Sequence, residues 1–199
     1  MTDRNWSMTN EQGIKGNLLM KRGLLLMMGI GLVFLSNEGL AQTYALNQDP
    51  VELVKKYVLL DQKGVRLEAL SWATLKPYVN WKEEPAWGHV MVTGEYKVMD
   101  DIRQWEVVSM LEVVIPVEFQ VLGAIYWETA GFLPEKHVER VKFRVKAVGG
   151  RWQIIEPVMP PHVGQKRMIN FVRQAMLQET EPSRRATLTA LRDELQKAK

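Results

Sequence analysis

Residues 139–156 read ERVKFRVKAVGGRWQIIE, and this stretch decides the fold. Apolar and basic residues alternate along 139–147, which is the period of a β-strand with one covered face. Gly149 and Gly150 then supply the positive φ angles of a tight turn, and a second strand returns from Trp152. The stretch predicts a β-hairpin. Its outward-facing residues form a basic stripe, which is typical of a solvated strand face and is also compatible with an acidic partner: Arg140, Lys142, Arg144 and Lys146.

The chain before the hairpin also has a strand period. Residues 89–98 alternate, and a β-rich run over 105–127 places Val113, Val117 and Phe119 on one face, with Glu118 in the solvated outer row. Such a pattern predicts an antiparallel sheet with one covered face. Pro116 lies inside the run and predicts a bulge or an edge position, because proline cannot donate to a β-ladder.

Helices are predicted before and after these strands in the sequence. Asp49-Pro50 is typical of a helix start, and the apolar residues up to Gly64 follow helical spacing. Ser71 is predicted to cap a shorter second helix. After the hairpin, residues 163–178 predict a closing helix, and Ser183 is predicted to cap a leucine-striped helical tail over 181–199 that docks or binds a partner.

Composition and targeting signals narrow the class of protein. Lys and Arg number 26 against 23 Asp and Glu, so no basic surface of the kind that binds nucleic acid is indicated. Residues 20–41 have the charge, apolar stretch and small-residue site of a bacterial-type signal peptide beginning near Met20, with a membrane anchor as the alternative. We therefore expect an exported, periplasmic or secreted protein that meets the membrane only through this segment. Residues 1–19 are interpreted as an over-extended N-terminus and 42–48 as a linker.

The order of elements resembles the NTF2-like superfamily of cone-shaped α+β domains, also called cystatin-like, which includes ketosteroid isomerase and the SnoaL-type cyclases. The features that carry the resemblance are the helix at 49–63, the strand at 113–121 and the GGRWQI turn at 149–154. It covers residues 49–157. The resemblance implies an α+β fold in which N-terminal helices pack in a curved antiparallel sheet, leaving a cavity at the open end. The domain is predicted to span 49–180, with the helix at 163–178 as an addition.

Few residues are candidates for catalysis. Tyr57 and Asp61 are four apart on the first helix, so they share a face and can form an acid–base pair; the alternative is an exposed Asp61 near the helix end. His162 precedes a helix and is a weaker candidate base, with an exposed turn residue as the alternative. The chain has no cysteine, and its three histidines lack metal-ligand spacing, so neither a metal nor a cofactor is predicted.

The stretch WKEEPAWGHV at 81–90 connects the second helix to the first strand. Trp81 and Trp87 are predicted to anchor this connector as large apolar side chains, with Glu83 and Glu84 in water at its tip. The connector then forms a rim of the cone. The side chains predicted to bind a ligand are Tyr57, Trp72, Trp87 and Phe119.

Three functions remain open from the sequence. The favoured one is a non-catalytic exported domain that binds a small apolar ligand or a protein partner in or around its cone. The second is a small-molecule isomerase, cyclase or dehydratase that uses Tyr57 and Asp61. The third is a structural or oligomerisation module, with a homodimer through the sheet face.

Overall fold

A computed structural model describes residues 49–198 of the chain. The signal peptide predicted at 20–41, the extension at 1–19 and the linker at 42–48 lie outside these residues. In the described part, no helix has the length and apolar character needed to cross a membrane.

The first helix, α2 (Pro50–Gln62), begins and ends as the sequence predicts. The Asp49 carboxylate accepts a hydrogen bond from the Val51 backbone N–H at 3.0 Å, and Gly64 takes a left-handed conformation with φ of 70° just beyond the helix. A short 3-10 turn (Val65–Leu67) leads to the second helix, α3 (Ser71–Leu75). The predicted Ser71 cap is wrong. Leu70 occupies the N-cap position, and the Ser71 hydroxyl instead donates a hydrogen bond to the Glu84 carboxylate.

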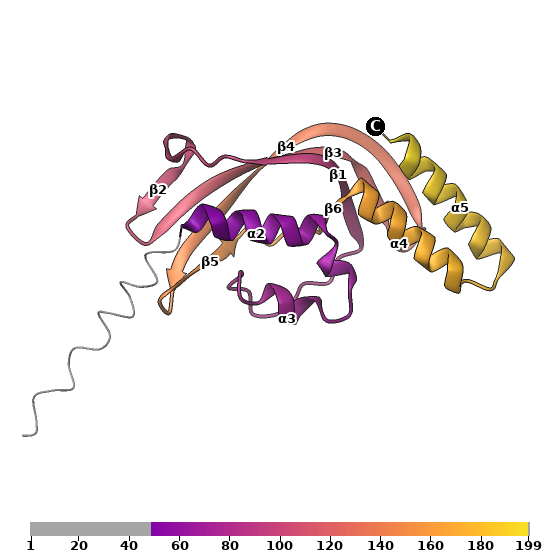
Figure 1. Cartoon of the computed structure of the whole chain (residues 1–199), viewed down its shortest axis with the longest axis horizontal. Helices are drawn as coiled ribbons and strands as arrows, with labels where there is room; N and C mark the ends of the chain where they lie inside the picture. The colour runs from indigo at the N-terminus through magenta and orange to yellow at the C-terminus, as the bar shows by residue number, and fades with distance from the viewer. Residues whose placement is uncertain (1–48, 199) are drawn as a thin grey trace, which may run out of the picture. The chain divides into compact units, whose positions relative to one another are not determined.

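Six strands form one sheet, in which β5, β4, β3, β1 and β6 lie in that order and β2 pairs with β3 beyond the end of β1. All pairs are antiparallel except β1 with β6. Figure 1 shows that the sheet curls strongly and that α2 lies along its hollow side. The predicted α+β class with a curved sheet is confirmed. The strands are β1 (His89–Val98), β2 (Glu106–Ser109), β3 (Glu112–Tyr126), β4 (Gly131–Val148), β5 (Arg151–Glu156) and β6 (His162–Gly164).

The predicted hairpin is confirmed in β4 and β5. Gly149 and Gly150 have φ of 56° and 79°, as a two-residue type I′ turn requires. Strand β4 begins at Gly131, earlier than the alternation at 139–147 indicates, because it pairs with the whole length of β3 as far as Tyr126. The turn between β3 and β4 therefore lies at 127–130, at the far end of the sheet from the glycine turn.

Pro116 occupies a local edge within a central strand. Its carbonyl accepts the Met99 N–H at 3.0 Å, on the side of β3 where β1 has ended and β2 has not yet begun pairing. In an antiparallel strand the N–H and C=O of one residue point to the same side, so no partner there requires the missing N–H. Of the two predicted settings, the edge position is the one observed.

Two hydrophobic cores share the sheet. The first lies between α2 and the hollow side and includes Tyr57, Phe119 and Phe143. The second joins the sheet to α4 (Gln165–Gln178) and α5 (Pro182–Lys197), which lie side by side in Figure 1. Leu191 and Leu195 of α5 are buried there, so the leucine-striped tail is docked. Its N-cap residue is Glu181, and the predicted Ser183 cap is wrong.

The basic stripe on β4 is matched by glutamates. Lys146 lies 3.2 Å from Glu112, which also pairs with Arg144, and Arg140 lies 4.0 Å from Glu118 on the neighbouring strand. A cross-strand ladder of opposite charges is a common feature of a solvated sheet face. This face therefore presents paired charges rather than an unbalanced positive surface.

Candidate functional site

Tyr57 and Asp61 both point from α2 into the interior of the fold. Only 1% of Tyr57 and 2% of Asp61 is exposed. The Asp61 side chain avoids solvent although it lies near the helix end, because the chain beyond α2 folds back over it and supplies charged and polar partners. The exposed alternative considered for Asp61 is wrong.

Asp61 forms a buried ion pair with Arg66, with 3.7 Å between carboxylate and guanidinium. Its other oxygen accepts the His162 backbone N–H at 2.9 Å. Burial raises the pKa of Asp61 above its ordinary value, and Arg66 and the His162 N–H oppose that shift. Burial and the charge of Asp61 also raise the pKa of Tyr57. The Asp61 carboxylate is thus held by structural partners, and the phenol remains protonated.

His162 lies in β6, where 2% of it is exposed, so the exposed-turn alternative is wrong. Nδ1 lies 2.9 Å from the Pro160 carbonyl oxygen and Nε2 lies 3.0 Å from a Glu139 carboxylate oxygen. Both neighbouring atoms are oxygens, so each ring nitrogen of His162 already has a polar partner inside the fold. The bond from His162 holds the pKa of Glu139 below its ordinary value. The candidate base His162 is therefore engaged at both ring nitrogens by residues of the fold.

Several buried polar atoms around Arg66 have no hydrogen-bond partner in the described residues. We call this group the buried polar cluster: Tyr57 OH, Asp61 Oδ1, Arg66 Nη1, Trp81 Nε1 and Trp87 Nε1. The Arg66 guanidinium lies 5.7 Å from the centre of the Trp81 ring and 6.0 Å from that of Trp87, so cation–π contacts hold it in place. Four of the five atoms are N–H or O–H donors. Buried donors without a hydrogen-bond acceptor are rare in proteins, and within this cluster Arg66 Nη1 and Asp61 Oδ1 face one another as an ion pair at 3.7 Å.

A polar pocket of about 410 Å³ opens beside this cluster. Its wall includes Arg66, Ser71, Glu84, Trp87 and Trp127. The Ser71 hydroxyl lies 2.7 Å from Glu84, which fixes this carboxylate in the wall rather than in water at the tip of the connector. Glu84 is thus only partly exposed, whereas Glu83 is exposed as the sequence predicts.

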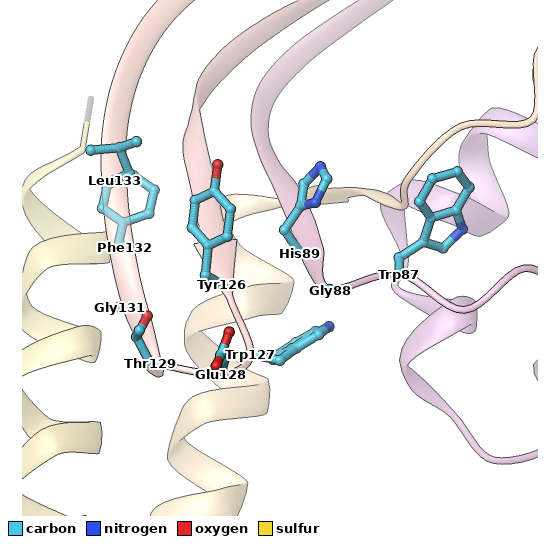
Figure 2. A pocket seen from close by; sticks show the side chains of 10 residues that line it. All are labelled: Trp87, Gly88, His89, Tyr126, Trp127, Glu128, Thr129, Gly131, Phe132 and Leu133. Atoms are coloured by element: carbon cyan, nitrogen blue, oxygen red, sulfur yellow. The ribbon is translucent and has the colours of Figure 1, made fainter.

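An aromatic groove of about 810 Å³ lies at the far end of β3 and β4. Figure 2 shows Trp87, His89 and Tyr126 along one wall, with Trp127 at the turn. His89 stacks near Tyr126 with 5.5 Å between ring centres, and Trp127 lies 6.2 Å from Phe171 of α4. The groove is lined by Trp87, Gly88, His89, Tyr126, Trp127, Glu128, Thr129, Gly131, Phe132 and Leu133. It shares Trp87 and Trp127 with the polar pocket, so the two adjoin.

The four residues predicted to bind a ligand lie in different parts of the structure. Trp87 lines both the groove and the polar pocket. Tyr57 and Phe119 belong to the first core, and Trp72 packs against that core with part of its surface exposed. The structure does not bring these four side chains together around one cavity.

Sequence reasoning missed most of the groove. Tyr126 precedes a short turn that begins at Trp127, and Phe132 and Leu133 follow it. Aromatic and apolar residues on both sides of a four-residue turn are the signal that marks this end of the sheet. Within residues 49–198 no group of three or more His, Asp or Glu side chains is placed to hold a metal ion. No protein-family model, curated protein or solved structure matches this chain.

Proposed function

We propose that this protein is an exported, non-catalytic binding domain of the NTF2-like type that holds a small apolar ligand in the aromatic groove. The observation that carries the proposal is the groove itself, whose volume of about 810 Å³ suits a small molecule. Tyr126, Trp127 and Leu133 remain substantially exposed on it. Exposed apolar residues gathered in a concave site favour binding.

The polar side chains in the fold support a binding role over a catalytic one. Asp61 forms an ion pair with Arg66 and accepts a hydrogen bond from the His162 backbone N–H. The two ring nitrogens of His162 contact the Pro160 carbonyl and the Glu139 carboxylate. A general base needs a free lone pair within reach of its substrate. The isomerase, cyclase or dehydratase alternative would require these contacts to break.

Binding is tested with the neutral fluorescent probe N-phenyl-1-naphthylamine. We expect saturable binding with a fluorescence increase, and a loss of affinity of about tenfold or more in the double variant Tyr126→Ser, Leu133→Ser, because apolar wall area is removed. The matched control is Leu177→Ser, an exposed leucine on α4 outside the groove. Melting temperatures of all variants are measured alongside. Absence of saturable binding, or equal affinity in the double variant, contradicts the proposal.

We propose self-association as a second candidate function, favoured by apolar residues at the outer edge of the sheet. Val107 and Met110 are 62% and 93% exposed, and no second strand in the described range pairs with β2. Antiparallel pairing of two copies of β2 would set Val107 against Val108 and Glu106 against Ser109, so no like charges meet. This contact along the edge of the sheet differs from the homodimer through the sheet face that the sequence predicts.

Sedimentation velocity tests the second candidate. We expect a concentration-dependent dimer that the variant Val108→Lys converts to monomer, because a lysine on an edge strand opposes strand addition. The control is Val138→Lys, at an exposed position on β4. A monomer at all concentrations for the unaltered chain would exclude this function and leave the groove proposal standing.

A further inference from the structure

Aromatic rings form much of the wall of the aromatic groove, and two of them are well exposed. Tyr126 and Trp127 are 42% and 41% exposed, and both line the groove. The face of an aromatic ring carries a negative electrostatic potential, because its π electrons lie above and below the plane of the ring. A ligand in the groove therefore meets surfaces that attract positive charge.

Glu128 adds a full negative charge to this wall. It follows Trp127 in the turn between β3 and β4, its side chain is exposed, and it lines the groove (Figure 2). Glu128 takes part in none of the ion pairs formed within residues 49–198. Among the described residues that line the groove it is the only carboxylate, and none is a lysine or an arginine. The groove wall thus presents a negative charge that no lysine or arginine of the wall neutralises.

Arg66 is the cation that contacts this wall from behind. Its guanidinium lies 6.0 Å from the centre of the Trp87 ring, and its side chain is only 1% exposed. The Arg66 charge is compensated inside the fold, since Asp61 lies 3.7 Å away. Because Trp87 already contacts a cation, the rings left to attract a charged ligand are the exposed ones of Tyr126 and Trp127.

The apolar character of the groove selects among the possible charged groups. An anion would meet both the ring faces and the Glu128 carboxylate, which repel it. An ammonium group with N–H donors would lose its hydration against a wall that is mainly apolar and offers few acceptors. A quaternary ammonium group has no N–H to leave unpaired, and its methyl groups make apolar contact with the rings while its charge is attracted to them.

We propose that the ligand in the aromatic groove carries a quaternary ammonium group, which lies against the exposed faces of Tyr126 and Trp127 beside the Glu128 carboxylate. This inference rests on the proposed binding function and adds the chemical class of the ligand. The groove volume of about 810 Å³ leaves room for an apolar body next to the cationic group.

The test uses naphthalene probes of nearly equal size in competition with N-phenyl-1-naphthylamine. They are trimethyl(naphthalen-2-yl)ammonium, its uncharged isostere 2-tert-butylnaphthalene, and the anion naphthalene-2-sulfonate. We expect the cation to bind about tenfold more tightly than the anion, while the hydrocarbon reports apolar contact alone. Titrations are run at pH 8, where histidine side chains are in general uncharged, because His89 also lines the groove.

Variants of the wall assign this preference to its residues. Glu128→Gln should weaken binding of the cation about threefold and leave the hydrocarbon unchanged, because only the carboxylate charge is removed. Tyr126→Leu and Trp127→Leu each keep an apolar side chain but remove a ring face, so each should weaken the cation more than the hydrocarbon. The matched control is Glu95→Gln, the same change of charge at an exposed position on β1 outside the groove. The affinity for N-phenyl-1-naphthylamine and the melting temperature are measured for every variant.

The outcomes separate the two proposals. If N-phenyl-1-naphthylamine binds but the cation does not displace it, or displaces it no better than the anion, the quaternary ammonium inference is overturned and the binding function stands. The inference is also overturned if Glu128→Gln and both ring variants weaken the cation and the hydrocarbon equally. If N-phenyl-1-naphthylamine itself does not bind, the groove function fails and the inference fails with it.

Discussion

Arg66 carries a positive charge in the interior of this fold. Its pairing with Asp61 is buried on both sides, with side-chain exposures of 1% and 3%. Removing one partner of such a pair leaves an uncompensated charge out of water, so Arg66→Met should lower the free energy of unfolding by about 3 to 5 kcal/mol. Urea denaturation measures the change.

The comparison for Arg66 is Arg103, which pairs with Asp101 at 2.7 Å on the surface. Exposed pairs contribute little, so Arg103→Met should leave the unfolding free energy almost unchanged. Equal effects of the two substitutions would mean that the Asp61–Arg66 pair is not buried as described.

The ionisation of Glu139 makes the stability of the folded protein depend on pH. The hydrogen bond from His162 lowers the pKa of Glu139 in the folded state, so the folded protein holds this proton less tightly than the unfolded chain. The stabilisation is present above the ordinary glutamate pKa of about 4.3 and is lost as pH falls through the lowered value. Because Glu139 is partly exposed, we expect Glu139→Gln to cost about 1 kcal/mol at pH 6.

Unfolding free energies of the unaltered chain and of Glu139→Gln, measured from pH 6 down to pH 3, check this. The difference between the two should shrink toward zero across the acid range. The charged or titratable neighbours that act on Glu139 are His162 and His137, and both remain in the variant. A difference that stays constant with pH would contradict the predicted shift.

These residues also show how much of the site could be predicted from the sequence. The four-residue spacing of Tyr57 and Asp61 predicts that they share a helix face, and both are buried. The partner of Asp61 could not be predicted in the same way, because the His162 N–H that binds it comes from 101 residues further along the chain. Periodicity reports local geometry, whereas burial of a charge is decided by segments that meet only in the folded state.

At the scale of elements, β3 has a bulge next to the strand ends that form the groove, and we expect this bulge to position them. The register of β3 on β4 shifts between Val121 and Gly123, and Gly123 has φ of 153°. A Cβ atom there would lie 2.2 Å from the Leu133 carbonyl oxygen. Gly123→Ala must therefore move the backbone that carries Phe132 and Leu133, at a cost of roughly 3 kcal/mol or more.

The matched control for Gly123 is Gly94 in β1, where an added Cβ would meet its nearest neighbour at 3.6 Å. Gly94→Ala should change stability by less than about 1 kcal/mol. Thermal unfolding and the probe titration together make the test, since Gly123→Ala should weaken probe binding at temperatures where the protein is still folded. Unchanged binding in folded Gly123→Ala would show that the bulge does not position the groove.

Elements with strong periodicity were predictable, and those defined by their partners were not. The α2 helix and the β4–β5 hairpin follow from Asp49-Pro50 and from Gly149-Gly150. The first half of β4 was missed because its sequence, GFLPEKHV at 131–138, lacks clean alternation and is extended through pairing with β3. Strand β6 has three residues and exists only as a parallel partner of β1. Such strands carry almost no local signal.

Across the whole described domain, one sheet carries two hydrophobic cores. The α2 core includes Val54, and the α4–α5 core includes Leu195, each fully buried. Strand β1 runs between them, since it pairs with β3 and β6 and supplies Val90 and Val92 to the second core. Loss of either core would leave apolar faces of the same strands in water. The two cores should therefore not unfold separately.

This coupling predicts a single cooperative transition. Val54→Ala and Leu195→Ala, which remove buried methyl groups, should lower stability by about 1 to 2 and about 2 to 5 kcal/mol respectively. In each variant the urea transitions followed by tryptophan fluorescence and by far-ultraviolet circular dichroism should coincide, as two-state unfolding requires. If Leu195→Ala instead produced an early transition that left tryptophan fluorescence unchanged, α4 and α5 would form an independent unit. The aromatic groove, where Trp127 contacts Phe171 of α4, would then lose its outer support before the sheet itself unfolds.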